Sequence, residues 1–374
     1  MGQAPEWRFD PLTGRRVLIS PDRGERPLHP TAFCPFCEGH ESETPPEVLA
    51  YRDPGSSPNG PGWRVRVVPN RFAAVRMDLP CSPSPLRGGG RWEGSASERD
   101  ESLTCSPLSA SERGAGGSMD AGGSSSGAPD ADPTPQPPPR SGEGEKAPGL
   151  GVAEVFLEGP HHETKFRNLP ADVARDVVRA WRDRLQFWRN DGRLAFAQVF
   201  KNEGEAAGAS VDHCHSQLIA LPFVPPRVAD ELKLASDPAG CTFCRWIASE
   251  RAGPKFVFES DRFAVFCPSA PRFPGETWIL PKAHSAAFET LTDTDATDLS
   301  NVLRNLLVGV ADALAGPDFN LIVKSAPFRH DGTFHWRIEI LPRLTSTAGW
   351  EWGTGLLINT MFPERAAELL RAAG

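Results

Sequence analysis

The chain repeats one order of motifs, and this repetition constrains its fold more than any other feature. Each copy opens with a Cys-x-x-Cys pair, continues through a strand-like stretch, and then has a Pro-and-His stretch, a helix and two further strands. The pairs are Cys34/Cys37 and Cys241/Cys244, and a shared Arg-Phe-Ala at 71–73 and 262–264 aligns the copies. The repetition predicts an α+β fold of two tandem domains, each an antiparallel sheet with a packed helix.

Apolar periodicity locates the helix of each copy. In the first copy, apolar residues recur at three- and four-residue spacing from Val173 to Trp188, after a proline that suits a first helical turn. In the second copy, the same spacing runs from Leu299 to Val310, and Gly316-Pro317 stops the helix. The closing strands are predicted over residues 194–200 and 213–221 in one copy, and 319–324 and 335–341 in the other.

A change in composition marks the domain boundaries. Residues 80–148 are dense in Gly, Ser and Pro and have no sustained apolar periodicity, so we predict a disordered insertion, with a hidden interaction motif as the alternative. The first domain then comprises residues 1–79 and 149–228, and it carries the chemistry. The second domain comprises residues 229–374 and is expected to be a degenerate, substrate-binding copy.

Charge and hydropathy exclude several classes of protein. The 374 residues carry a formal net charge of −8, which argues against a nucleic-acid scaffold, because such a protein shows a basic face. No run of roughly 18 apolar residues is present, so no membrane span is predicted. The first residues lack a basic and then apolar signal, and we therefore expect a cytoplasmic protein.

Each copy supplies a complete Cys₂His₂ set in the same order. The first set is Cys34, Cys37, His162 and His213, and the second is Cys241, Cys244, His284 and His335. Structural zinc sites commonly combine a Cys-x-x-Cys pair with two histidines, and four protein ligands leave no position for a catalytic water. We predict two structural zinc sites, with a redox-active cysteine pair as the alternative.

A small-residue loop with two alternating histidines is the strongest candidate for chemistry. On an extended backbone, residues two apart share a face, so His213, His215 and Gln217 are expected to point the same way. The second copy has Arg337 where His215 stands in the first. With His213 bound to metal, His215 is free to attack phosphorus as a neutral imidazole, aided by donors from Gln217 and Ser210. The alternative is a histidine with no chemical role at the edge of a strand.

The run from Phe200 to Gln217 resembles the signature F-x-N-x-G-x-x-x-G-x-S-x-x-H-x-H-x-Q of the galactose-1-phosphate uridylyltransferase family, the double-domain branch of the histidine triad superfamily. The resemblance implies two histidine-triad-like domains in a homodimer. It implies that His215 is the nucleophile that becomes uridylylated. Ser210 and Gln217 would hold the transferred phosphoryl group, and Asn202 would line the same pocket.

The resemblance extends to residues outside this run. Asn70 falls in a stretch that the family places near the nucleotide, and Arg23 and Arg26 resemble arginines that grip the sugar phosphate. Glu351 resembles a carboxylate that binds hexose hydroxyls across a dimer, and Cys34, Cys37, His162 and His213 match the family's zinc ligands. The partners implied are a nucleotide sugar and a sugar 1-phosphate, with no nucleic acid and no membrane.

Departures from the family pattern bear on substrate choice. Cys214 and Ser216 replace a proline and a glycine of the best-known members, and the second Cys₂His₂ set resembles the branch of ADP-glucose phosphorylase-like adenylyltransferases. The leading hypothesis is exchange of UMP between UDP-glucose and galactose 1-phosphate by double displacement, in galactose metabolism. The alternatives are the same chemistry on an adenine nucleotide and a zinc-stabilised nucleotide-binding protein without turnover.

Overall fold

The computed structural model describes residues 4–10, 13, 15–21, 23, 33–77, 146–235 and 240–374. Most of the predicted insertion therefore lies outside the described residues. Its last residues are described, and they correct the expected boundary. Lys146–Pro148 forms a strand, β5, that pairs antiparallel with β1 (Glu6–Phe9), so these residues are not part of a disordered segment. β1 also pairs with β2 (Arg16–Ile19), which completes a small three-stranded sheet.

The main sheet has ten strands, and each neighbouring pair is antiparallel. From one edge of the sheet to its middle, the strands of the first half are β3 (Leu49–Arg52), β4 (Trp63–Pro69), β6 (Val152–Glu158), β8 (His215–Leu221) and β7 (Phe196–Glu203). The second half continues with β12 (Phe319–Lys324), β13 (Arg337–Pro342), β11 (Thr277–Pro281), β10 (Phe263–Phe266) and β9 (Phe256–Glu259).

The sheet order repeats with the predicted duplication. Read from its outer edge inward, the first half is β3-β4-β6-β8-β7 and the second half is β9-β10-β11-β13-β12. β7 and β12 join the halves, with Glu203 opposite Phe319 and Val199 opposite Val323. The α+β class and the duplicated architecture are confirmed. The halves share one continuous sheet, because the innermost strand of each copy, β7 or β12, pairs with the innermost strand of the other.

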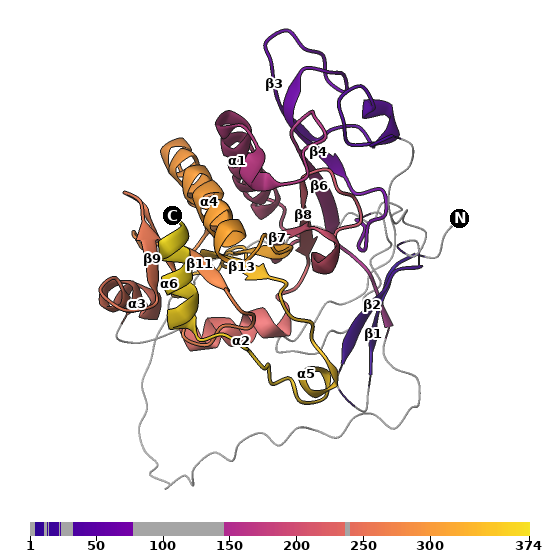
Figure 1. The fold of residues 1–374 in the computed structure, drawn as a ribbon. Coiled ribbons are helices and arrows are strands. Elements are labelled where there is room, and N and C mark those ends of the chain that lie inside the picture. The colour runs from indigo at the N-terminus through magenta and orange to yellow at the C-terminus, as the bar shows by residue number, and fades with distance from the viewer. Residues whose placement is uncertain are drawn as a thin grey trace, which may run out of the picture.

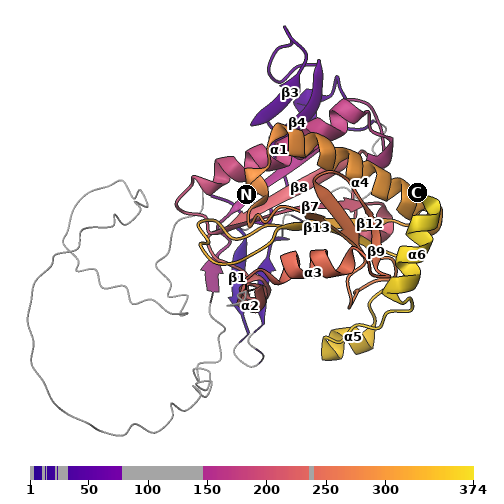
Figure 2. The same cartoon turned by 90° about the vertical axis from the view of Figure 1, so that its left-hand side faces the viewer.

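Two long helices cover one face of the sheet. They are α1 (Ala171–Arg189) and α4 (Asp293–Ala313), and they lie side by side in both views (Figures 1 and 2). Both helices are where the apolar spacing predicts them. A capping box between Thr292 and Asp295 fixes the start of α4, since each residue satisfies a backbone N–H of the other. α6 (Pro363–Ala373) packs against α4 at the end of the chain.

The core lies between this helix layer and the sheet. Burial alternates along β12 and along most of β7, as expected for strands with one face on the core. One apolar cluster contains buried residues of both halves, among them Phe156, Trp181, Leu303 and Trp336. The opposite face of the sheet carries the short helices α2 (Pro226–Ala235) and α3 (Thr242–Glu250) (Figure 2).

No helix among the described residues combines the length and the apolar character that crossing a membrane requires.

Candidate active site and metal centres

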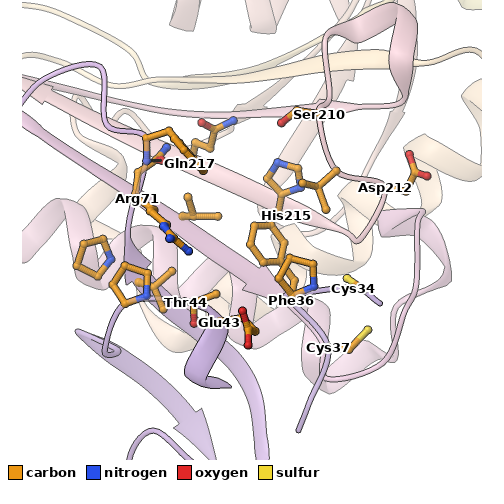
Figure 3. Close-up of a pocket in the computed structure, with 18 of the residues that line it drawn as sticks. Cys34, Phe36, Cys37, Glu43, Thr44, Arg71, Ser210, Asp212, His215 and Gln217 are labelled. Atoms are coloured by element: carbon orange, nitrogen blue, oxygen red, sulfur yellow. Dashed lines mark hydrogen bonds between the residues drawn. The ribbon is translucent and has the colours of Figure 1, made fainter. Parts of the chain in front are cut away.

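A cavity of about 620 Å³ opens on the sheet face that is opposite α1 (Figure 3). Its walls come from the segment around the first Cys-x-x-Cys pair, the end of β4 with the turn after it, the loop before β8, and β8 itself. Five residues with predicted substrate-binding or catalytic roles line it: Arg23, Asn70, Ser210, His215 and Gln217. Phe36, Val68, Pro69, Phe72 and Val155 give it an apolar wall. The arrangement suits a ligand with a flat apolar end and an anionic end.

His215 is the first residue of β8, and its side chain is buried with 6% exposed. Its Nδ1 lies 2.9 Å from the backbone oxygen of His213. Because a carbonyl can only accept, Nδ1 carries the hydrogen, and the lone pair of the neutral ring is on Nε2. The ring lies beside Phe36, with the two centroids 5.6 Å apart, and it faces the same space as Ser210 and Gln217 (Figure 3). A backbone contact therefore decides which ring nitrogen of His215 carries the lone pair.

The predicted alternation on β8 is confirmed. His215 and Gln217 line the cavity, whereas Cys214 and Ser216 are buried on the helix side. The indole Nε1 of Trp181 in α1 donates to Ser216 Oγ at 2.7 Å. Asn70 also lines the cavity, and its side-chain oxygen accepts from the N–H of Phe72 at 2.9 Å. That contact orients the Asn70 amide so that its NH₂ group is left to donate.

Two predicted site residues that the structure describes are not at the cavity wall. Asn202 points from β7 toward β12, where its side-chain oxygen accepts from Asn320 Nδ2 at 2.9 Å. Glu351 does not line the cavity either. It lies on the exposed helix α5 (Gly349–Thr354), where its carboxylate accepts from the N–H of Ala348. Arg26 lies outside the described residues.

The first Cys₂His₂ set comes together as predicted. The Sγ atoms of Cys34 and Cys37 each lie 3.6 Å from His213 Nδ1, and Cys37 Sγ lies 3.7 Å from His162 Nδ1. A tetrahedral ion with Zn–S of ~2.3 Å and Zn–N of ~2.0 Å separates neighbouring sulfur and nitrogen ligands by roughly 3.5 Å. His213 Nε2 donates to the backbone oxygen of Gly159 at 2.9 Å, which leaves Nδ1 to bind metal.

The second set repeats this geometry. Cys241 and Cys244 place their sulfurs 3.5 Å from His335 Nδ1, and Cys244 Sγ lies 3.4 Å from His284 Nδ1. His335 Nε2 contacts the backbone oxygen of Pro281 at 2.9 Å, as His213 does with Gly159. The ligand atoms of each set lie within 4.8 Å of one another. Both sets could therefore hold a metal ion, and their sulfur and nitrogen donors fit zinc.

Electrostatics also favour a cation at both positions. Burial lowers the pKa of His213 and of His335 to about 4, so both rings are neutral near pH 7, which is the form that binds metal. Without an ion, burial and the neighbouring Cys34 raise the pKa of the Cys37 thiol to about 11, and Cys244 behaves in the same way beside Cys241. A thiolate at Cys37 or at Cys244 therefore needs a positive charge beside it, which a bound metal ion would supply.

A buried lysine, Lys201, lies behind His215 on the helix side of the sheet. Lys201 Nζ donates to Glu158 Oε2 at 2.8 Å, Cys214 Sγ at 3.1 Å and the backbone oxygen of His215 at 3.0 Å. Burial alone would lower the pKa of Lys201, but the Cys214 and Glu158 charges outweigh it and raise the pKa. The charged ammonium thus holds the backbone of His215 from the helix side of the sheet. Lysine is rarely buried, so the sequence contains no signal for this role.

The equivalent position in the second half is filled with ion pairs. Arg337, at the start of β13, donates to Glu339 Oε1 at 2.8 Å and pairs with Glu231 of α2. Its guanidinium lies 4.7 Å from the ring centroid of Trp278, and Lys324 lies 2.7 Å from Glu231. This network occupies the place that corresponds to the cavity of the first half. Arginine and not histidine stands at this position, and the assignment of the histidine chemistry to the first half stays a prediction.

Comparisons with known proteins cover the whole chain. The family described as "Domain of unknown function (DUF4921)" matches residues 177–372. ADP-glucose phosphorylase of Arabidopsis thaliana is 30% identical over 99% of this chain and 93% of its own length. Galactose-1-phosphate uridylyltransferase of Thermotoga maritima is 29% identical over 98% of each chain.

The solved structures agree with the sequence comparisons. The crystal structure of the Arabidopsis thaliana ADP-glucose phosphorylase with bound ADP-glucose superimposes with a TM-score of 0.69 at 29% identity, covering 100% of this chain and 99% of that one. The similarity in sequence and in fold therefore extends over both halves. This chain belongs to the family of nucleotidyltransferases that includes galactose-1-phosphate uridylyltransferase and ADP-glucose phosphorylase.

Proposed function

We propose that the protein exchanges UMP between UDP-glucose and galactose 1-phosphate through a covalent bond to His215 Nε2. The observation that carries this proposal is the orientation of His215. Its Nδ1–H donates to the backbone oxygen of His213 at 2.9 Å, and the ring shares one cavity with Ser210 and Gln217. The full-length similarity to a galactose-1-phosphate uridylyltransferase supports the choice of substrates.

The transfer has two displacements. In the first, the Nε2 lone pair attacks the α-phosphorus of UDP-glucose, the bond from that phosphorus to the bridging oxygen breaks, and glucose 1-phosphate leaves with the electron pair. In the second, a phosphate oxygen of galactose 1-phosphate attacks the same phosphorus, the P–N bond breaks, and the electron pair returns to Nε2. UDP-galactose leaves, and the histidine is again neutral.

The cavity residues supply charge stabilisation for both steps. While the P–N bond exists the imidazole is positively charged, and the His213 carbonyl that accepts from Nδ1 stabilises this charge. Ser210 and the NH₂ group of Gln217 donate to the non-bridging oxygens, and Arg23 neutralises the phosphates. Asn70 and the apolar wall near Val68 hold the nucleoside. By the family resemblance, Arg26 assists Arg23.

We infer that both Cys₂His₂ sets bind Zn²⁺ and that both sites are structural. A bound zinc ion would cross-link segments far apart in the sequence and would supply no open coordination position, since four protein ligands complete each tetrahedron. The first site has a second consequence. It fixes His213, whose backbone oxygen orients the His215 ring. Cysteines that bind metal and form no disulfide suit a reducing compartment, and we therefore propose the cytoplasm.

A homodimer is part of the proposal. Large apolar side chains are exposed on the segment that contains α5 and the turn after it: Trp350, Trp352, Leu356, Ile358 and Phe362. α5 lies away from the layered body of the molecule (Figures 1 and 2). Exposed apolar patches of this kind are typical of protein interfaces. In a dimer, Glu351 would reach the hexose in the partner's cavity.

The second candidate function is the same double displacement with an adenine nucleotide and with phosphate as the acceptor. It is favoured by the 30% identity to ADP-glucose phosphorylase over 99% of this chain. Initial-rate kinetics separate the candidates. Parallel double-reciprocal lines with UDP-glucose and galactose 1-phosphate support the first proposal, and turnover of ADP-glucose with phosphate alone supports the second. Absence of nucleotide exchange with both pairs would refute both.

A further inference from the structure

We propose that the second half of the molecule holds the phosphate-binding loop of the first half in place through Asp318 and Asn320. The loop comprises residues 204–212 and carries Ser210 toward the cavity and leads into His213. Asp318 and Asn320 are positioning residues, since they touch the loop and not the substrate. The catalytic part of this inference rests on the proposed nucleotidyl transfer.

The loop begins as a tight turn at the junction of the two halves. It leaves β7 after Glu203, forms a short 3₁₀ helix at Glu205–Ala207, and has glycines with positive φ at both ends. The N–H of Gly208 donates to Glu205 at 2.9 Å, and the N–H of Ala209 donates to Gly204 at 3.1 Å. This turn sets the direction in which the chain continues to Ser210.

Asn320 holds the turn from β12. It lies directly opposite Asn202 in the pairing of β7 with β12. Its Nδ2 donates to Asn202 Oδ1 at 2.9 Å and to the backbone oxygen of Ala207 at 2.8 Å. Both hydrogens of the amide are therefore used, one on the strand and one on the turn. This contact gives Asn202 a role that differs from lining the cavity: it orients the Asn320 amide.

Asp318 holds the turn from the residue just before β12. Its Oδ2 accepts from the backbone N–H of Ala206 at 2.9 Å, and its Oδ1 lies 3.7 Å from Lys165 Nζ. A Cβ on Gly204 would overlap the Asp318 carboxylate, and the φ of Gly204 is +89°. Glycine is needed here for two reasons, the left-handed backbone and the close approach of a side chain from the other half.

The two contacts explain why a half without a reacting histidine is joined to the sheet at β7. Asp318 satisfies an N–H of the turn, and Asn320 satisfies a C=O of the turn, so the turn is fixed in both directions. A misplacement of about 1 Å in a reacting group costs on the order of 100-fold in rate. Movement of the loop that positions Ser210 would cause such a loss of rate, and the second half supplies the rigid support that prevents it.

The test compares Asn320→Ala and Asp318→Ala with Ser210→Ala and with the double variant Ser210→Ala/Asn320→Ala. The matched controls are Asn301→Ala and Asp312→Ala, which change exposed side chains of α4. Single-turnover formation of the nucleotidyl-histidine is followed by intact mass with UDP-glucose and with ADP-glucose. Hydrogen exchange of residues 204–212 is measured on the same proteins without substrate, and zinc content and thermal melting report folding.

We expect Asn320→Ala and Asp318→Ala to slow adduct formation by roughly 10- to 100-fold. Asp318 and Asn320 together form the proposed clamp on the loop. The double variant should be no more than about 2-fold slower than Ser210→Ala, because this clamp acts through the loop that carries Ser210. Exchange in residues 204–212 should be at least roughly 10-fold faster than in the controls. Multiplicative rate effects in the double variant, or unchanged loop exchange, would overturn the inference.

The two levels of the proposal fail in different ways. If the wild-type protein forms no adduct with either nucleotide sugar, the proposed function is wrong, and the exchange data alone decide whether the clamp exists. If the wild type forms the adduct and Asn320→Ala matches it in rate and in loop exchange, the clamp is wrong and the nucleotidyl transfer stands.

Discussion

The Lys201→Met substitution tests the buried charge behind His215, the proposed nucleophile. Lys201 and Glu158 have side chains that are 1% and 0% exposed, and their charged atoms lie 2.8 Å apart. The three N–H groups of the ammonium are used by Glu158, Cys214 and the backbone oxygen of His215. Methionine has a similar length and no charge, so the substitution removes all three contacts and leaves the shape nearly unchanged.

The expected loss is large because Glu158 remains behind. Removing one partner of a buried ion pair destabilises a protein by about 3–5 kcal/mol, since the other charge stays uncompensated in a medium of low polarity. One oxygen of Glu158, Oε1, has no hydrogen-bond partner among the described residues, and Oε2 would keep only the weak S–H donor of Cys214 at 3.1 Å once the lysine is gone. We therefore expect the free energy of unfolding to fall by about 3–5 kcal/mol.

Urea unfolding followed by tryptophan fluorescence measures this change. Lys233→Met is the matched control: Lys233 pairs with Asp230 on the surface, where the side chains are 77% and 69% exposed, and a loss below about 1 kcal/mol is expected. The double variant Lys201→Met/Glu158→Gln should recover part of the loss, because it removes the stranded charge. A Lys201→Met protein within about 1 kcal/mol of wild type would refute the account of this cluster.

Three further predictions concern the metal sites, a buried hydrogen bond and a network of ion pairs. Folded protein should contain two zinc ions per chain by metal analysis, and Cys34→Ser should slow adduct formation more than Cys241→Ser, because only the first site fixes the histidine that orients His215. Ser216→Ala should lower the free energy of unfolding by about 1–3 kcal/mol, because it leaves the buried indole N–H of Trp181 without its acceptor. Burial alone would raise the pKa of Glu231, but Arg337 and Lys324 outweigh it and lower the pKa. Its contribution to stability is therefore present above about pH 4.3 and lost as the pH falls through the lower folded pKa, so the gap in melting temperature between wild type and Glu231→Gln should be widest near pH 7 and close toward pH 3.

The duplicated plan and the histidine alternation could be predicted because they rest on local rules. Strand periodicity places His215 and Gln217 on one face, and the ordered recurrence of Cys-x-x-Cys and histidine identifies both ligand sets. The helices α1 and α4 follow from apolar spacing in the same way. In each case the physical constraint acts between residues whose relation is visible along the chain.

The contacts between the halves could not be predicted, since nothing local encodes them. The sequence indicates two tandem domains, whereas β7 and β12 pair into one sheet. Asn202 was expected at the cavity wall, and its actual partner, Asn320, is 118 positions away. Nor does the sequence show that Gly204 makes room for the Asp318 carboxylate from the other half. Such long-range pairings depend on tertiary register, which a single sequence does not specify.

The most direct test of the central claim is peptide mapping of the covalent intermediate. The protein is incubated with UDP-glucose or ADP-glucose without an acceptor, digested at neutral to alkaline pH to preserve the phosphoramidate, and analysed by tandem mass spectrometry. The account predicts one nucleotidyl group on His215, of the base that the enzyme selects, and its absence from folded, zinc-loaded His215→Ala. A nucleotidyl group on another residue, or an adduct that persists in His215→Ala, would contradict it.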